Sequence, residues 1–172
     1  MKHFSAYIIA VLLPSYYSIT YYNISPSDCL GFLGGIFIWM VAEYCFHRYA
    51  FHNNNLSPRT YELLAYNHAK HHQNPNTDKD LLLPLRLTMP VALFLFVAAW
   101  ILISLPFATL LLFGMLAGLT FYEFVHYQAH NKFYNVWPFK FLTVRHLRHH
   151  FEHENRYFGV TSDIIDRIMG TN

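Results

Sequence analysis

The sequence has little charge and few cysteines, and each shortage excludes a class of protein. Only 13% of the 172 residues are charged, against about 25% in soluble globular domains. The 12 lysines and arginines exceed the 10 aspartates and glutamates by two, so no concentrated basic face is available for nucleic acid. The two cysteines, Cys29 and Cys45, are far apart in the sequence, so neither a disulfide framework nor a thiolate metal site is supported.

Hydrophobic residues are abundant instead, at 54% of the chain, and they form four long apolar stretches. The stretches are approximately residues 4–22, 29–46, 87–105 and 106–125. Each has about 18 to 20 residues, which is enough for a helix to cross a hydrocarbon core of about 30 Å. The first stretch contains Pro14 and many serines and tyrosines, and its alternative is a signal peptide. Because no small-x-small cleavage pattern follows it, we favour a retained membrane anchor.

The basic residues predict how these stretches are oriented. All twelve lysines and arginines fall on one side of the four stretches, and none lies in residues 23–28 or at the junction of residues 105 and 106. By the positive-inside rule, the side that carries the lysines and arginines is cytoplasmic. We therefore expect an all-α, multi-pass integral membrane protein with four transmembrane helices in two hairpins and a cytoplasmic helical cap.

Ten of the twelve histidines recur in the same order in two halves of the chain. They are His47, His52, His68, His71 and His72 in the first half, and His126, His130, His146, His149 and His150 in the second. The first pair is offset by 79 positions and the other four by 78. We interpret this as an internal repeat, approximately residues 29–86 and 106–171, within a single membrane domain covering residues 1–172.

The spacing of these histidines indicates metal ligands. Histidines three positions apart lie about 60° apart around a helix and those four apart lie about 40° apart, so each cluster of this kind projects from one helix face. Neutral imidazoles in such an arrangement bind metal ions. His47 and His52 are five apart, about 140° around a regular helix, so they need a helix end or a bend between them, or else serve different ions. Ten ligands suit two ions at about five each, whereas a closed structural zinc site uses four.

Other ionisable residues near these clusters have different expected roles. His3 and His153 lie outside the repeat, and we interpret them as ordinary side chains. Glu43 and Glu123 lie inside apolar stretches, where an ionised carboxylate costs on the order of 3 kcal/mol, one turn before His47 and His126. Such carboxylates accept the second N–H of a ligating imidazole and fix its orientation. The alternative is that both lie close enough to the interface to be solvated.

With these motifs, the chain resembles the fatty acid hydroxylase / sterol desaturase superfamily over roughly residues 39–171. The similarity rests on the four histidine motifs, HRYAFH at 47–52, HAKHH at 68–72, HYQAH at 126–130 and HLRHH at 146–150. The tail FGVTS at 158–162, followed by Asp166 and the Gly170-Thr171 pair, is similar to the ending of the fatty-acid 2-hydroxylases that act on sphingolipid acyl chains.

The resemblance implies a membrane di-iron oxygenase in which the ten histidines hold both metals and Asp166 supports the cap. It implies two iron ions as cofactors, which zinc can replace in purified samples, and O2 as co-substrate. The expected reaction is hydroxylation of an unactivated C–H bond of a fatty acyl chain, in a fatty acid or an acyl lipid, with carbon 2 as a candidate position. The sequence shows no fused cytochrome b5 domain, so we expect an external electron donor, either cytochrome b5-like or ferredoxin-like.

Two other functions remain open at this point. Carotenoid hydroxylases of similar length share the histidine motifs, so the alternative within the superfamily is a sterol or carotenoid hydroxylase or desaturase. A non-catalytic membrane protein that binds or transports metal is the third hypothesis. Analysis of lipid products distinguishes a sterol or carotenoid enzyme from a fatty acyl hydroxylase. Reductant-driven O2 uptake distinguishes an oxygenase from a protein that only binds or transports metal.

Overall fold

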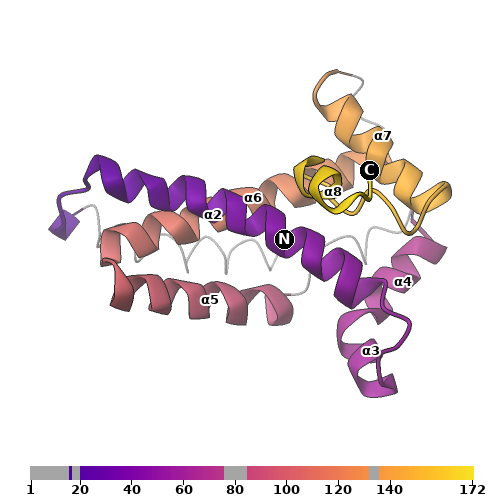
Figure 1. Cartoon of the computed structure of the whole chain (residues 1–172), viewed down its shortest axis with the longest axis horizontal. Helices are drawn as coiled ribbons and strands as arrows, with labels where there is room; N and C mark the ends of the chain where they lie inside the picture. Colours follow the sequence, from indigo (N-terminus) through magenta and orange to yellow (C-terminus); the bar gives the residue numbers. More distant parts are fainter. Residues whose placement is uncertain (1–15, 17–19, 76–84, 132–135) are drawn as a thin grey trace. The chain divides into compact units, whose positions relative to one another are not determined.

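The structure, a computed structural model, describes residues 16, 20–75, 85–131 and 136–172, and every element in these segments is helical (Figure 1). The elements are α2 (Pro26–Cys45), η1 (Phe46–Phe51), α3 (Pro58–Leu64), α4 (Tyr66–Gln73), α5 (Leu85–Leu102), α6 (Leu105–Asn131), α7 (Phe139–Phe151) and α8 (Ile164–Met169). The prediction of an all-α chain is confirmed for these segments.

The chain divides into two compact units. The first comprises residues 1–39 and 84–119, and the second comprises residues 40–83 and 120–172. The long helices α2 and α6 each begin in the first unit and end in the second. All ten repeated histidines belong to the second unit.

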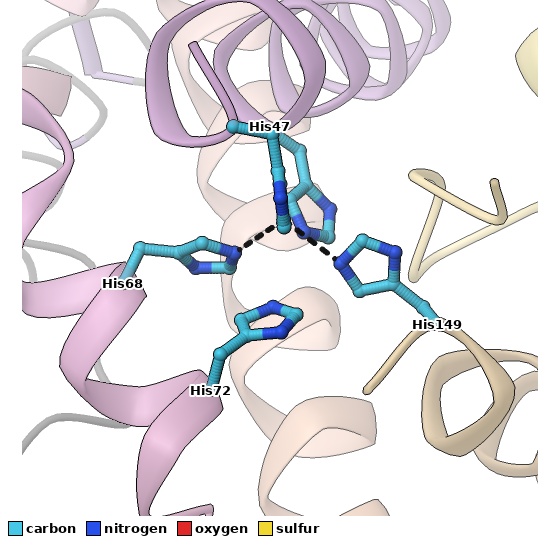
Figure 2. Close-up of side chains that lie close together, drawn as sticks. His47, His68, His72 and His149 are labelled. Carbon is cyan, nitrogen blue, oxygen red and sulfur yellow. Dashed lines mark hydrogen bonds between the residues drawn. The ribbon is translucent and has the colours of Figure 1, made fainter. Parts of the chain in front are cut away.

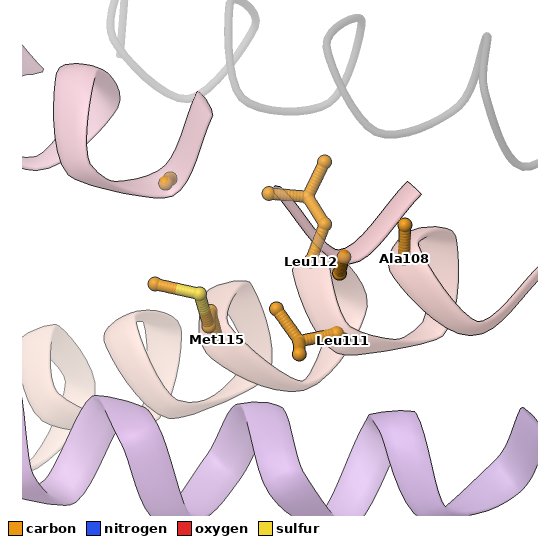
Figure 3. Close-up of a cluster of buried hydrophobic side chains, with 6 residues drawn as sticks. Ala108, Leu111, Leu112 and Met115 are labelled. Carbon is orange, nitrogen blue, oxygen red and sulfur yellow. The ribbon is translucent and has the colours of Figure 1, made fainter. Parts of the chain in front are cut away.

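The core of the first unit is an apolar cluster between α5 and α6. Ala92 and Ala99 come from α5, and α6 contributes the four residues labelled in Figure 3, which are Ala108, Leu111, Leu112 and Met115. Alanines on both helices allow the two backbones to approach closely, and the larger leucine and methionine side chains fill the remaining space.

Glycines bring α2 against α6 in the same unit. A Cβ atom added at Gly35 would overlap the backbone of Leu111, and one added at Gly114 would overlap the backbone of Phe32. Direct packing of one helix backbone on another requires residues without a side chain. Gly34, by contrast, has open space around it.

The start of α2 is fixed by a reciprocal cap. The backbone N–H of Ser25 donates to Asp28 Oδ2 at 2.8 Å, and the backbone N–H of Asp28 reaches Ser25 Oγ at 3.3 Å. Pro26 occupies the first helical position, where its missing N–H has no cost. Ser104, between α5 and α6, donates to Asp28 Oδ1 at 3.3 Å and so ties this turn to the start of α2.

Two helical stretches are long and apolar enough to cross a membrane, Pro26–Phe51 and Leu105–Asn131. They contain the second and fourth of the four predicted spans. The third was predicted over residues 87–105, but the apolar part of α5 is shorter and ends at Leu102 (Leu87–Leu102). The first falls mostly outside the residues that the structure describes. Side chains of α5 such as Phe94 and Leu102 are more than two-thirds exposed, as expected for a helix in contact with lipid. These features indicate a membrane protein, while the four-helix arrangement remains a prediction.

Candidate metal centre

The second unit gathers the ten repeated histidines into two groups of five. The first histidine group is His47, His52, His68, His72 and His149, and the second histidine group is His71, His126, His130, His146 and His150. Within each group, one ring nitrogen of every histidine lies within 4.8 Å of the others. Figure 2 shows rings of the first group turned toward one another from different parts of the chain.

The pair His47 and His52 is brought together by a π-helix. Residues Phe46–Phe51 form one wide turn, and the backbone N–H of His52 donates to the carbonyl of His47, five residues earlier, at 3.2 Å. In a π-helix positions i and i+5 are hydrogen-bonded neighbours, so the separation of about 140° in a regular helix does not apply. The two ring centroids are 5.2 Å apart. The alternative that the sequence left open is therefore decided in favour of one shared group.

Each histidine group contains four histidines from one half of the repeat and one from the other half. His149 of the second half joins the first histidine group, and its counterpart His71 joins the second. The two groups adjoin, because the rings of His72 and His150, one from each group, stack with centroids 4.0 Å apart. The arrangement is a pair of neighbouring five-imidazole cages that share both halves of the chain.

The distances between ring nitrogens test whether these cages fit a metal ion. In the first group, His52 Nε2 lies 3.0 Å from the Nε2 atoms of both His68 and His149. In the second, His71 Nε2 lies 2.9 Å from His126 Nε2 and 3.1 Å from His130 Nε2. Nitrogens bound to one ion at about 2.1 Å are about 3.0 Å apart at a right angle and about 3.4 Å apart in a tetrahedron. The cages therefore fit five- or six-coordinate ions better than closed tetrahedral zinc.

Buried ring nitrogens without hydrogen-bond partners also indicate that the two groups bind metal ions. The Nε2 atoms of His47, His72 and His150 are buried and have no hydrogen-bond partner among the residues that the structure describes. Buried polar atoms are nearly always satisfied, so orphaned ring nitrogens inside each histidine group are the signature of a ligand. The histidine clusters thus support metal binding by this chain.

Burial keeps neutral those imidazoles of the two groups that lie outside the membrane-crossing helices. Desolvation lowers the pKa of His52 to about 4. Desolvation, reinforced by neighbouring imidazoles, lowers the pKa of His149 to about 3 and holds the pKa values of His68, His146 and His150 well below their usual range. A neutral imidazole has a free lone pair, which is the form that binds a metal.

Backbone carbonyls of the C-terminal segment set the orientation of two rings in the first group. His47 Nδ1 donates to the carbonyl of Phe158 at 2.6 Å, and His149 Nδ1 donates to the carbonyl of Arg156 at 2.7 Å. Because a carbonyl can only accept, the proton is on Nδ1 and the lone pair is on Nε2. No sequence signal could reveal these partners, since a backbone carbonyl is present at every position.

Glu43 acts on this segment rather than on an imidazole. The sequence led us to expect that its carboxylate would accept an N–H from His47. Its described contacts are instead with the backbone N–H groups of Val160 and Thr161 and with the Thr161 hydroxyl, which donates at 2.6 Å. Glu43 therefore holds the chain two residues beyond the Phe158 carbonyl that orients His47.

Asp166 holds the same segment from its other side. Its carboxylate accepts the backbone N–H groups of Phe158 at 2.9 Å and Gly159 at 2.8 Å, together with the Thr171 hydroxyl at 2.8 Å. Arg145 of α7 completes the set with a donor at 3.1 Å. Asp166 is fully buried, and sequence reasoning had missed Arg145 and Thr161 as members of this network.

The remaining predicted residues are placed as follows. Glu123 is buried, but no described imidazole lies within hydrogen-bonding distance of its carboxylate, so its role stays a prediction. His153 is exposed and belongs to neither group, in keeping with its interpretation as an ordinary side chain. His3 lies outside the described residues.

Comparisons with known proteins point to one family. Residues 32–171 match the model of the family described as fatty acid hydroxylase. A dihydroceramide fatty acyl 2-hydroxylase of Arabidopsis thaliana is 30% identical over 137 residues, covering 80% of this chain and 58% of that protein. A ceramide very long chain fatty acid hydroxylase of Saccharomyces cerevisiae is 34% identical over 157 residues, covering 83% of this chain and 38% of that protein.

A solved structure agrees with this assignment. The structure described as full-length scs7p, with only the hydroxylase domain visible, superposes with a TM-score of 0.79 at 28% identity. The match covers 97% of this chain and 64% of that chain. The chain thus spans between about two-fifths and three-fifths of the length of these curated relatives.

Proposed function

The chain belongs to the fatty acid hydroxylase family, and from that membership we propose that it hydroxylates a fatty acyl chain at carbon 2. The acyl chain would be that of a ceramide-like lipid or a free fatty acid, in line with the names of its relatives. The balanced reaction is R–H + O2 + two electrons + two protons giving R–OH and water. The electrons come from a separate donor, cytochrome b5-like or ferredoxin-like.

The observation that carries the proposal is the pair of adjoining five-histidine groups in the second unit. We assign all ten histidines as ligands of two iron ions. When bound, the ions supply the activation of O2 and the oxidation of an unactivated C–H bond, for which protein side chains have no equivalent. The neutral imidazoles would hold the ions through their free lone pairs, and the carbonyls of Arg156 and Phe158 aim two of the rings.

Two phenyl rings exclude water from the first histidine group. The Phe51 ring stacks on His68 with centroids 5.0 Å apart. The buried Phe158 ring lies 5.6 Å from the ring of His47 and 5.5 Å from that of His149. A dry, apolar wall protects an oxidising centre from side reactions with solvent and suits the methylene groups of an acyl chain.

The same proposal includes the placement in the membrane. The chain crosses the bilayer with four helices in two hairpins, and the histidine groups lie on the cytoplasmic side, because every basic residue falls on that side of the apolar stretches. An acyl chain then reaches the site from the bilayer while electrons arrive from the cytoplasm.

The experiment begins with metal content. The full chain is purified from membranes of cells supplied with iron, beside the His149→Ala/His150→Ala variant, which removes one ligand from each group. We expect about two metal ions per chain, as ten imidazoles at about five per ion imply, and a large loss in the variant. Fewer than one metal ion per chain under every condition would overturn the proposal.

The second step measures the product. The iron-loaded protein is incubated with a reductant, an electron donor, labelled O2 and a ceramide or fatty acid. We expect one labelled oxygen atom at carbon 2 of the acyl chain, detected by mass spectrometry, and none without the donor. Label in an added sterol or carotenoid, with none in the acyl lipids, would instead establish the alternative within the superfamily.

A further inference from the structure

A groove of about 470 Å³ runs along the outer side of α7 in the second unit, away from the residues assigned to metal binding. Three cations line it, Lys140, Arg145 and Arg148. No aspartate or glutamate side chain is among its described lining residues. A cavity lined by three cationic side chains complements an anion.

Arg145 carries the clearest indication of a ligand. The residue is only 8% exposed, and its Nη2 donates to Asp166 Oδ2 at 3.1 Å. Its Nε is buried and has no hydrogen-bond partner among the described residues. The rings of Phe141 and Tyr157, with centroids 5.6 Å and 4.8 Å from the guanidinium carbon, hold the group in place. A fixed, buried N–H donor without an acceptor leaves one hydrogen bond for a ligand to complete.

The two flanking cations are free to turn toward the same ligand. Lys140 is exposed. Arg148 reaches Glu152 at 3.7 Å, but both side chains of that pair are more than half exposed. Such surface ion pairs contribute little, so Arg148 can exchange Glu152 for an anion at small cost.

Apolar side chains extend the groove beyond its cations. Trp137 is 80% exposed, and Phe141 and Val144 are each 41% exposed, and all three line the groove. A phosphate ion would satisfy the cations and leave these side chains in water. Basic and aromatic side chains that lie together are typical of the membrane interface, where the charge meets lipid headgroups and the rings meet the upper acyl chains.

We propose that this groove is a binding site for one anionic phospholipid. The phosphate completes the hydrogen bonding of Arg145 and pairs with Lys140 and Arg148, and the acyl chains cover Trp137 and Val144. The bound lipid is distinct from the substrate, because the groove lies on the outer face of α7 whereas the histidines of this helix are on its buried face. The site does not depend on the reaction at the metal centre.

The test measures lipid binding to the full chain in a nonionic detergent by native mass spectrometry. The probes are phosphatidylglycerol, phosphatidylcholine and inorganic phosphate. The main variant is Lys140→Gln/Arg148→Gln, which leaves the buried Arg145–Asp166 pair intact. The control is Arg59→Gln/Arg167→Gln, which removes two exposed cations outside the groove and so makes the same change in net charge.

We expect one phosphatidylglycerol per chain, bound at least tenfold more tightly than phosphatidylcholine. Since each cation near an anionic lipid contributes about fivefold, the main variant should bind phosphatidylglycerol about 25-fold more weakly, and the control within about twofold of the unmodified chain. Equal binding of the two lipids, full displacement by an equal concentration of phosphate, or an equal loss in both variants would overturn the proposal. A lack of hydroxylase activity in the same samples would bear on the proposed function alone.

Discussion

Replacing Glu43 tests whether the C-terminal segment holds the first histidine group. The Glu43 carboxylate is the acceptor of three hydrogen bonds, from the backbone N–H groups of Val160 and Thr161 and from the Thr161 hydroxyl. Two residues before Val160, the carbonyl of Phe158 fixes His47. Glu43→Ala removes both acceptor oxygens and so all three hydrogen bonds, whereas Glu43→Gln keeps the shape and one carbonyl oxygen.

The structure gives the size of the effect. If the segment stayed in place, each of the two backbone N–H groups would be left without an acceptor, which costs about 1–3 kcal/mol of stability per group. The two together would cost on the order of 2–6 kcal/mol. The segment will therefore move, and with it the carbonyl that orients His47. Loss of such an outer hydrogen bond lowers metal affinity about 10- to 100-fold. The glutamine oxygen can still accept both N–H groups, so we expect Glu43→Gln to lose about fivefold at most, the value of about 1 kcal/mol of charge assistance.

The assay is a chelator titration of the iron-loaded full chain, with residual metal counted by mass spectrometry. Glu43→Ala should release one of two ions at an about 10- to 100-fold lower chelator concentration than the unmodified chain. Glu62→Ala, the same change at an exposed glutamate of α3, is the control and should behave like the unmodified chain. Retention of both ions by Glu43→Ala at unchanged affinity would refute the reasoning, because the segment would then have no influence on His47.

Three further predictions follow from the same geometry. His149→Ala and His71→Ala should each reduce the metal content from about two ions to about one, from opposite groups, and a chain that keeps two ions would contradict the assignment of these two histidines as ligands. Gly35→Ala places a methyl group on the backbone of α6 and should cost about 1–3 kcal/mol, seen as a lower melting temperature, whereas Gly34→Ala, with open space around it, should not. Burial lowers the pKa of His52 to about 4 in the folded chain, so the unfolded chain takes up the proton first. The metal-free protein should therefore lose stability as the pH falls from about 6.5 toward 4, and a melting temperature that stays constant over this range would show that these imidazoles are not buried.

The sequence was sufficient to identify the ten histidines that gather in the second unit, because histidine spacing is a local property. The i, i+4 pair His126 and His130 lies on one turn of α6 as expected. The neighbouring pair His47 and His52 could not be assigned, since a π-helix is one extra residue in a turn and leaves no signature in composition. The structure was needed to show that this extra residue is what brings the two rings together.

Glu43 shows a second limit of sequence reasoning. A buried carboxylate one turn before a ligand predicts a hydrogen bond to that ligand, yet its acceptors are used by the backbone of Val160 and Thr161, more than a hundred residues away in the chain. A contact of that separation depends on tertiary packing, and a local pattern cannot distinguish it from the contact with His47. The expectation identified a residue that acts on the site, but the carbonyl through which it acts was not visible in the sequence.

The exchange of histidines between the two groups has a simple geometric cause. On a regular helix, His72 lies about 40° from His68, whereas His71 lies about 60° from His68 on the opposite side and about 100° from His72. The three rings of H-x-x-H-H share one side of the helix but span about 100° of it. The outer two share a group, and the middle one belongs to the neighbouring group. The second half repeats the motif 78 positions later, so it returns His149 to the first group in the same way. Each half thus lacks one ligand for its own ion and supplies one to the other, and neither half can complete a five-histidine cage without its counterpart.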